Sequence, residues 1–261
     1  MSELFDALEL LKNSPNKSGI FTDLDGTLSE IAPTPADAVV TEGMRDAISK
    51  LAKKFAVVVI VSGRDSDEAK NIIAVEDLIY IGNHGLEWTH NGKQFYAPEA
   101  FNFFGLASSL SAELESLVDG SDLIVEKKKL GVAIHYRRAS DKELARISIL
   151  EIIKPFLEKY PLKSFEGRCV IELKPDLMVS KGDAVTAIAL RLGIKQAVYL
   201  GDDVTDLDAF KALKKLRDEG KIEAITIGIA SDETSKSIAE ESDFLLRSVG
   251  EVEDVLNWLA N

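Results

Sequence analysis

Two aspartates, Asp23 and Asp25, follow an apolar segment near the beginning of the chain, in the sequence FTDLDGTL (residues 21–28). Residues two apart in an extended segment point to one side, and Gly26 lets the backbone turn away behind them. A carboxylate in this position can attack phosphorus if a cation offsets the phosphate charge and a nearby acid protonates the leaving oxygen. A turn with two solvated aspartates is the alternative, but the apolar strand before them and the Gly-Thr after them favour chemistry.

Two later residues, Ser62 and Lys181, stand at positions that suit an anion. Ser62 follows the apolar run FAVVVIV (55–61) and precedes a predicted helix, so its hydroxyl and the free amides beside it can hold a phosphoryl oxygen. A simple helix cap would also explain this Ser-Gly turn. Lys181 begins another predicted helix, where the helix dipole disfavours a cation. That cost indicates an anion nearby, although a solvated lysine also fits the sequence.

Three aspartates, Asp202, Asp203 and Asp206, close a later apolar strand in the sequence LGDDVTD (200–206). Carboxylates so close together repel one another unless a hard cation lies among them, and Mg²⁺ prefers oxygen ligands. An acidic helix start, stabilised by the helix dipole, would account for Asp206 and Asp203 but leaves Asp202 unexplained. We therefore expect a magnesium site.

The segments that carry these residues alternate between short apolar runs and helix-like stretches. Strands are expected at 19–22, 55–61, 78–81, 197–200 and 222–227, and helices at 41–53, 65–73, 181–192, 206–216 and 234–241. This alternation predicts an α/β fold with a doubly wound, mainly parallel sheet and helices on both faces. Ligands of such sheets bind at the carboxyl ends of the strands, where the carboxylates stand.

The middle of the chain has a different pattern. It holds a hairpin signal at Asn91-Gly92, predicted helices at 107–118 and 141–157, and predicted strands at 123–126, 132–136 and 169–173. We therefore predict a small α+β domain over residues 87–176, inserted into a core domain formed by residues 1–86 and 177–261. The insert is nearly neutral, so it can approach an anion more easily than the core, which carries almost all of the net charge of −13.

Composition excludes several classes of protein. Hydrophobic residues at 46% and charged residues at 29% are typical of a soluble globular protein. The net negative charge argues against nucleic-acid binding, and no apolar run approaches the roughly 20 residues of a membrane helix. The acidic first residues do not resemble a secretory signal, and a single cysteine, Cys169, permits no internal disulfide. We expect a cytoplasmic protein in which Cys169 is a packed thiol.

In order along the chain, the segments around Asp23, Ser62, Lys181 and Asp202 resemble the four motifs of the haloacid dehalogenase superfamily of phosphatases. The resemblance implies a Rossmann-like core, with Asp23 as the nucleophile and Asp25 as the general acid and then the general base. It also implies that Ser62 and Lys181 hold the phosphoryl group. A domain inserted between the second and third motifs resembles the type-2 cap of that superfamily, which closes the site and selects the substrate.

The same resemblance implies a set of Mg²⁺ ligands. They are the carboxylate of Asp23, the backbone carbonyl of Asp25 and the carboxylate of Asp202, with Asp203 or Asp206 completing the site.

Within the superfamily, the chain resembles the trehalose-6-phosphate phosphatases. The resemblance lies in GNHGLE (82–87), VEKK (125–128), HYR (135–137), GRCVIELKP (167–175) and GDDVTD (201–206) followed by DAF (208–210). Leu207 departs from the usual Glu and Lys174 from the frequent Arg, and we expect Leu207 to lie beyond the metal. A sugar needs side chains that satisfy many hydroxyls. The implied substrate-binding residues are Gly63, Arg64, Asn83, His84, Lys128, His135, Arg137, Glu172 and Lys174.

The sequence leaves several alternatives open. His135 could be a structural histidine, and Lys127–Lys129 a solvated run. A phospho-aspartate receiver domain is disfavoured, because it lacks both the second acid and an inserted domain. A non-catalytic sugar-binding relative is disfavoured because all four motifs are intact. The enzyme alternatives are a phosphatase of sucrose phosphate or mannosyl-3-phosphoglycerate, and then a phosphohexomutase.

Overall fold

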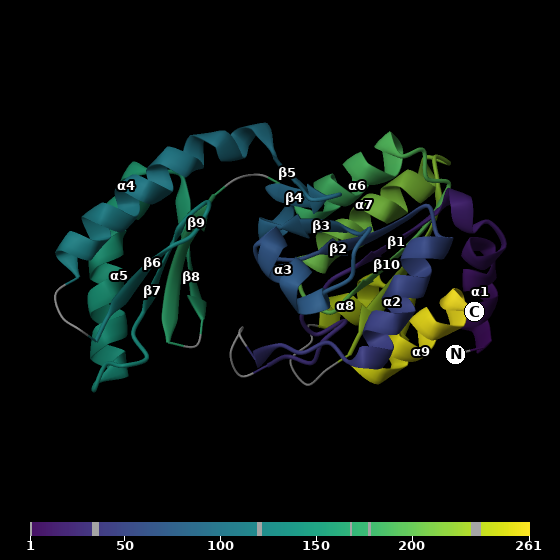
Figure 1. Ribbon diagram of the computed structural model, residues 1–261, viewed down its shortest axis with the longest axis horizontal. Coiled ribbons are helices and arrows are strands. Elements are labelled where there is room, and N and C mark those ends of the chain that lie inside the picture. Colours follow the sequence, from purple (N-terminus) through teal and green to yellow (C-terminus); the bar gives the residue numbers. More distant parts are fainter. Residues whose placement is uncertain (1, 33–36, 119–121, 168, 177–178, 231–235) are drawn as a thin grey trace. The chain divides into compact units, whose positions relative to one another are not determined.

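The structure is a computed structural model that describes residues 2–32, 37–118, 122–167, 169–176, 179–230 and 236–261. The chain divides into two compact units, the first formed by Met1–Phe95 and Val179–Asn261 and the second by Tyr96–Met178 (Figure 1). Each unit has its own sheet and its own helices.

The first unit is built around an eight-stranded sheet in the order β12-β11-β10-β1-β2-β3-β4-β5. Neighbouring strands from β12 to β3 run parallel, and β4 runs antiparallel to β3. The strands are β1 (Ser18–Thr22), β2 (Val57–Val61), β3 (Ile79–Gly82), β4 (Glu87–His90), β5 (Lys93–Tyr96), β10 (Gln196–Gly201), β11 (Glu223–Ile229) and β12 (Phe244–Leu246).

Helices cover both faces of this sheet, as Figure 1 shows. Successive strand residues point to opposite faces, so Ile20 and Phe21 belong to two separate apolar cores. One core is completed by α1 (Ser2–Asn13), α2 (Glu42–Lys54), α3 (Ser66–Ile73) and α9 (Val249–Ala260). The other is completed by α6 (Lys181–Arg191), α7 (Asp206–Asp218) and α8 (Lys236–Glu241). The predicted doubly wound, mainly parallel sheet is confirmed.

The expected hairpin at Asn91-Gly92 joins β4 to β5. Both residues have positive φ, 51° and 68°, which is the geometry of a tight two-residue turn. Because β4 pairs with β3, this hairpin extends the sheet of the first unit. The structure therefore divides the chain after Phe95 instead of after residue 86, and it places the second division after residue 178 instead of 176.

The second unit is an antiparallel sheet in the order β6-β7-β9-β8, with two helices along one of its faces (Figure 1). Its elements are α4 (Phe101–Leu117), β6 (Ile124–Lys127), β7 (Val132–His135), α5 (Lys142–Lys159), β8 (Leu162–Gly167) and β9 (Val170–Pro175). The α+β character expected of the insert is present.

Some elements differ from the sequence-based prediction. The predicted elements do not include helices α1 and α9 or strands β8 and β12, and α4 begins at Phe101 rather than near residue 107. The expected start of α8 at 234 lies outside the described residues. Among the residues that the structure describes, no helix has the length and apolar character needed to cross a membrane.

Candidate active site

Polar residues meet at the carboxyl ends of three neighbouring strands. Asp23 follows β1, Ser62 follows β2 and Asp202 follows β10. Because β1 lies between β2 and β10, these ends form the switch point at which open α/β sheets bind ligands. The amide of Asp23 donates to the carbonyl oxygen of Leu200 at 2.9 Å, which ties the end of β1 to β10.

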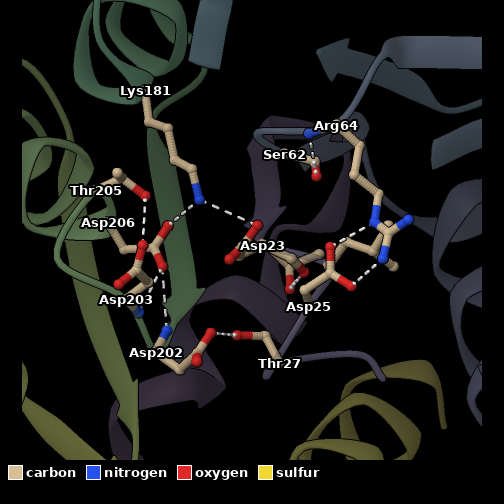
Figure 2. Close-up of polar contacts among 12 residues, drawn as sticks. Asp23, Asp25, Thr27, Ser62, Arg64, Lys181, Asp202, Asp203, Thr205 and Asp206 are labelled. Carbon is tan, nitrogen blue, oxygen red and sulfur yellow. Dashed lines mark hydrogen bonds and ion pairs between the residues drawn. The ribbon is translucent and has the colours of Figure 1, made fainter. Parts of the chain in front are cut away.

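Lys181 is the first residue of α6 and is only 2% exposed. A capping box between Ser180 and Asp183 fixes the start of this helix, so the lysine leaves it at a defined point. Its Nζ lies 3.0 Å from Oδ1 of Asp23 and 2.7 Å from Oδ1 of Asp206 (Figure 2). Burial lowers the pKa of Lys181, but the charges of Asp206 and Asp23 outweigh it and hold the pKa above its ordinary value. The side chain is a buried cation and not a solvated lysine.

Asp206, at the start of α7, is 0% exposed and organises the loop after β10. Its Oδ1 accepts hydrogen bonds from Lys181 and from the hydroxyl of Tyr199, both at 2.7 Å. Its Oδ2 accepts from the amides of Asp202 and Asp203 at 3.1 and 3.0 Å. Burial, followed by the charge of Asp206, raises the pKa of Tyr199 well above its ordinary value, so the phenol stays a donor. The sequence motifs do not indicate this role for Tyr199.

Asp202 lies against the loop that carries the first two aspartates. Its Oδ1 accepts a hydrogen bond from the hydroxyl of Thr27 at 3.1 Å, a role that the sequence did not indicate. A Cβ on Gly26 would lie 2.0 Å from Oδ2 of Asp202, and Gly26 has a φ of 80°. Only glycine permits both this conformation and this close approach. The Gly after the two aspartates therefore brings Asp202 close to the β1 loop.

Asp23, Asp202 and Asp206 each place a carboxylate oxygen within 4.8 Å of the others. Burial, with the neighbouring charge of Asp206, raises the pKa of Asp202 to about 7 and that of Asp23 well above its usual range. Like charges this close and this buried call for a further cation, and an all-oxygen donor set suits a hard divalent ion. The residues present therefore fit a divalent metal. Asp203 is exposed and lies outside this cluster.

Asp25 faces away from the cluster and is held by Arg64, as Figure 2 shows. Arg64 Nε lies 2.6 Å from Oδ2 of Asp25, and Nη2 lies 2.7 Å from Oδ1, a bidentate pair. Arg64 also pairs with Glu68, which lies in the first turn of α3. The structure thus places Arg64, expected to bind substrate, on the carboxylate expected to be the general acid.

Ser62 and the segment 83–85 form one connected loop region. The hydroxyl of Ser62 accepts a hydrogen bond from the amide of Arg64 at 3.1 Å, and its carbonyl accepts from the amide of His84 at 3.1 Å. The amide of Asn83 donates to the carbonyl of Arg64 at 2.7 Å. A Cβ on Gly63 would lie 2.6 Å from Cε1 of His84, so the imidazole packs directly against that glycine. Four predicted substrate-binding residues thus lie together beside Ser62.

The other predicted substrate-binding residues lie in the second unit. In β9, Ile171 and Leu173 are buried on the helix side of the sheet, so Glu172 and Lys174 lie on the opposite, open face. The register places Glu172 opposite Ala133, which lies two residues before His135 in β7. Glu172, Lys174 and His135 therefore share the open face.

Ion pairs connect the side chains of this open face. Lys174 Nζ lies 2.7 Å from Oε2 of Glu172, and both His135 Nε2 and Lys128 Nζ lie 2.8 Å from carboxylate oxygens of Glu126. Burial raises the pKa of Glu126, but the hydrogen bonds from Lys128 and His135 lower it by more. The pKa of Glu126 therefore falls below its ordinary value. Arg137 is exposed, just after β7.

Comparison with known proteins defines the class. A haloacid dehalogenase-like hydrolase from Bacteroides thetaiotaomicron, 13% identical, shares the fold with a TM-score of 0.59 over 93% of this chain and 99% of that one. A solved structure described as a trehalose-6-phosphate phosphatase related protein is 28% identical, with a TM-score of 0.70 over 93% of this chain and 96% of that one. These likenesses show that the chain has the fold of a haloacid dehalogenase-like hydrolase.

The family follows from the sequence comparisons. A rice (Oryza sativa subsp. japonica) protein named "Probable trehalose-phosphate phosphatase 4" is 32% identical over 253 residues, which are 91% of this chain and 67% of that protein. The family model "Trehalose-phosphatase" matches residues 21–246. The chain belongs to the trehalose-phosphatase family, as the resemblance of its motifs implied.

Proposed function

We propose that this chain hydrolyses trehalose 6-phosphate to trehalose and inorganic phosphate through an aspartyl-phosphate intermediate on Asp23. Family membership supports the substrate, and the rice relative is named as a probable trehalose-phosphate phosphatase. The observation that carries the chemistry is the buried contact of 3.0 Å between Lys181 and Asp23. It supplies a nucleophilic carboxylate with the cation that an approaching phosphate requires.

In the first step, a carboxylate oxygen of Asp23 attacks phosphorus and the bond between phosphorus and the sugar oxygen breaks. The leaving oxygen takes a proton from Asp25, which acts as the general acid, and trehalose is released. Lys181 remains beside Asp23, and the hydroxyl of Ser62 with the amides of its loop holds the phosphoryl oxygens.

In the second step, a water molecule attacks the phosphorus of phosphorylated Asp23. Asp25 takes a proton from that water, phosphate leaves, and the carboxylate of Asp23 is restored. The bidentate pair with Arg64 supports this role, because it fixes the plane of the Asp25 carboxylate. Arg64 acts here on the general acid and base as well as near the substrate.

Mg²⁺ is the proposed metal, held by Asp23, Asp202 and the backbone carbonyl of Asp25. When bound, it would supply positive charge that neutralises the phosphate oxygens. Asp206 would support the site indirectly, because its oxygens already accept from Lys181, Tyr199 and two amides. Thr27 would hold Asp202 in orientation.

We propose that the second unit is the cap that selects the substrate. Its open face offers carboxylates beside cations, as in the pair of Lys174 with Glu172, and such pairs can exchange partners for sugar hydroxyls. Phe165 lies opposite Glu172 in the register and offers an apolar surface for a sugar ring.

The test is phosphate release from a panel of sugar phosphates with Mg²⁺ present. We expect trehalose 6-phosphate to give the highest kcat/KM, above glucose 6-phosphate, sucrose phosphate and mannosyl-3-phosphoglycerate. Excess EDTA should abolish the activity and added Mg²⁺ should restore it. A preference for glucose 6-phosphate would indicate a different sugar phosphatase, and full activity in EDTA would contradict the metal.

A further inference from the structure

Glu87 is a carboxylate with 0% exposure that lies outside the cluster of Asp23, Asp202 and Asp206. It is the first residue of β4, directly after the segment Asn83–Gly85. Burial of a carboxylate is costly unless hydrogen bonds compensate for lost water. Burying the Glu87 carboxylate is therefore tolerated only because hydrogen bonds compensate for it. The partners in those hydrogen bonds indicate what the side chain does.

Three elements converge on the Glu87 carboxylate. Its Oε1 accepts hydrogen bonds from the amide of Ser66, the first residue of α3, at 2.8 Å and from Nδ2 of Asn83 at 3.0 Å. Its Oε2 accepts from Nε2 of Gln94, in β5, at 3.2 Å. A single oxygen thus joins the start of α3 to the loop after β3.

These two joined segments form the predicted phosphate-binding region. The loop from Ser62 to Arg64 runs directly into α3. The amides of Asn83 and His84 donate to the carbonyls of Arg64 and Ser62 at 2.7 and 3.1 Å. Glu87 fastens the far end of both segments, at Ser66 and Asn83, and so closes this set of bonds.

The backbone of the second segment needs such support. Asn83 and His84 have φ values of 49° and 58°, in the left-handed region that residues with a Cβ seldom occupy. Strained residues of this kind persist only where their surroundings determine the conformation, and they gather at functional sites. The bond from Asn83 to Glu87 is a side-chain contact that stabilises this turn, which packs His84 against Gly63.

We propose that Glu87 is a positioning residue that holds the phosphate-binding loop in its productive geometry. Its carboxylate bridges the Ser66 amide and the Asn83 side chain, and thereby sets where Ser62 and Arg64 meet the phosphoryl group. The inference rests on the proposed phosphatase chemistry but not on the identity of the sugar. Glu87 acts through this loop and does not touch the reacting atoms.

Three substitutions of Glu87 test whether the oxygen that bridges Ser66 and Asn83 is the feature that matters. Glu87→Gln keeps an oxygen for Ser66 and Asn83, while Gln94 can rotate its amide to accept from the new NH₂ group. Glu87→Ala removes the bridge, and Glu87→Asp keeps the carboxyl group but shortens its reach by one methylene. Gln94→Ala is the matched control, because it removes a bond to the same carboxylate and leaves the bridge intact.

The kinetic readout uses an aryl phosphate as substrate, with Mg²⁺ present. We expect kcat to fall at least about 10-fold in Glu87→Ala and Glu87→Asp, since small displacements of positioning groups are costly to turnover. Glu87→Gln and Gln94→Ala should stay within about 3-fold of wild type, because the bridging hydrogen bonds survive in both. If Glu87→Ala does not fold, Glu87→Asp carries the comparison.

Amide hydrogen exchange gives a second readout that needs no activity. The amides of Ser66, Asn83 and His84 should exchange faster in Glu87→Ala or Glu87→Asp, while amides of β1 and β10 stay protected. Unchanged kcat and unchanged exchange in these variants would overturn the inference, and so would a loss in Glu87→Gln as large as in Glu87→Ala. Failure of the wild type to hydrolyse trehalose 6-phosphate would overturn the proposed substrate alone.

Discussion

Asp202 and Asp203 are adjacent in the sequence but occupy opposite environments. Asp202 is buried, contacts Thr27 and lies with Asp23 and Asp206 in the three-carboxylate cluster. Asp203 is exposed. Within the described residues, its carboxylate accepts a single side-chain hydrogen bond, from the hydroxyl of Thr205 to Oδ2 at 3.3 Å. The pair therefore offers a matched comparison for the metal site.

We expect Asp202→Asn to weaken Mg²⁺ binding by at least roughly 10-fold, because the variant loses a charged ligand at a site of buried carboxylates. Asp203→Asn, an identical chemical change one residue away, should shift the affinity less than about 3-fold, since an exposed charge is well screened. Isothermal titration of both purified variants with Mg²⁺ would measure this. Equal losses would mean that Asp203 is a ligand, as the sequence also allowed.

Residue types alone could predict the chemistry of the site but not the hydrogen bonds that join its loops. The positions of Asp23, Ser62 and Lys181 follow from motifs at predicted strand and helix ends. The structure brings all three together at the carboxyl ends of the central strands. The contacts of Tyr199 and Glu87 could not be predicted. They depend on which loops meet across the sheet, and local sequence does not encode that.

At the scale of elements, the open face of the cap sheet carries the proposed specificity. Glu172 pairs with Lys174 on that face, whereas Glu166, on β8, pairs with Arg146 of α5 on the other face. Both are glutamates of the same sheet, so comparing their alanine variants distinguishes the loss of a sugar contact from the loss of a structural ion pair.

We expect Glu172→Ala to reduce kcat/KM for trehalose 6-phosphate by about 5- to 150-fold, equivalent to roughly 1–3 kcal/mol for one lost buried sugar contact. The same variant should hydrolyse an aryl phosphate nearly as well as wild type, because that substrate does not reach the cap. Glu166→Ala should leave both substrates nearly unchanged. Steady-state kinetics on the two substrates decide the matter, and equal losses for Glu172→Ala on both would remove the cap from substrate selection.

Periodicity predicted most of the core elements and failed at the margins. The central strands are short, mostly apolar runs, and β2 consists of Val and Ile alone, so the apolar pattern predicts β1, β2 and β10 to within one or two residues. Helix α9 has apolar residues at helical spacing, with Val252, Val255 and Leu259 all buried, but it is absent from the predicted elements. Strand β8 has no such signal: Phe165 and Glu166 are exposed, and pairing with β9 alone makes it a strand.

At the scale of the whole molecule, the buried acidic cluster couples stability to pH and to metal. Burial raises the pKa of Asp202 from 3.8 to about 7 without a metal. The folded state then binds more protons than the unfolded state between these values, so its stability falls as pH rises from about 4 to about 7. Mg²⁺ needs the deprotonated carboxylates, and its stabilising effect should grow over the same range.

We therefore expect the metal-free protein to lose melting temperature between pH 5.5 and 8, and to lose less of it when Asp202 is replaced by Asn. Added Mg²⁺ should raise the melting temperature of the wild type more at pH 8 than at pH 5.5. Calorimetric scans in EDTA and in Mg²⁺ at the two pH values provide the comparison. An equal pH dependence of the melting temperature in wild type and Asp202→Asn would show that folding does not raise the pKa of Asp202.

The central claim is that Asp23 becomes phosphorylated during turnover. With an aryl phosphate, whose leaving group needs little protonation, Asp25→Asn should slow water attack more than the first step, so that phosphoenzyme accumulates when this substrate and Mg²⁺ are added. Rapid acid quenching followed by peptide mass spectrometry measures this directly. We predict one phosphoryl group on the peptide that contains Asp23, and none when Asp23→Asn is combined with Asp25→Asn. Turnover by the Asp23→Asn variant at a rate near that of wild type, or a phosphoryl group on another residue, would contradict the account.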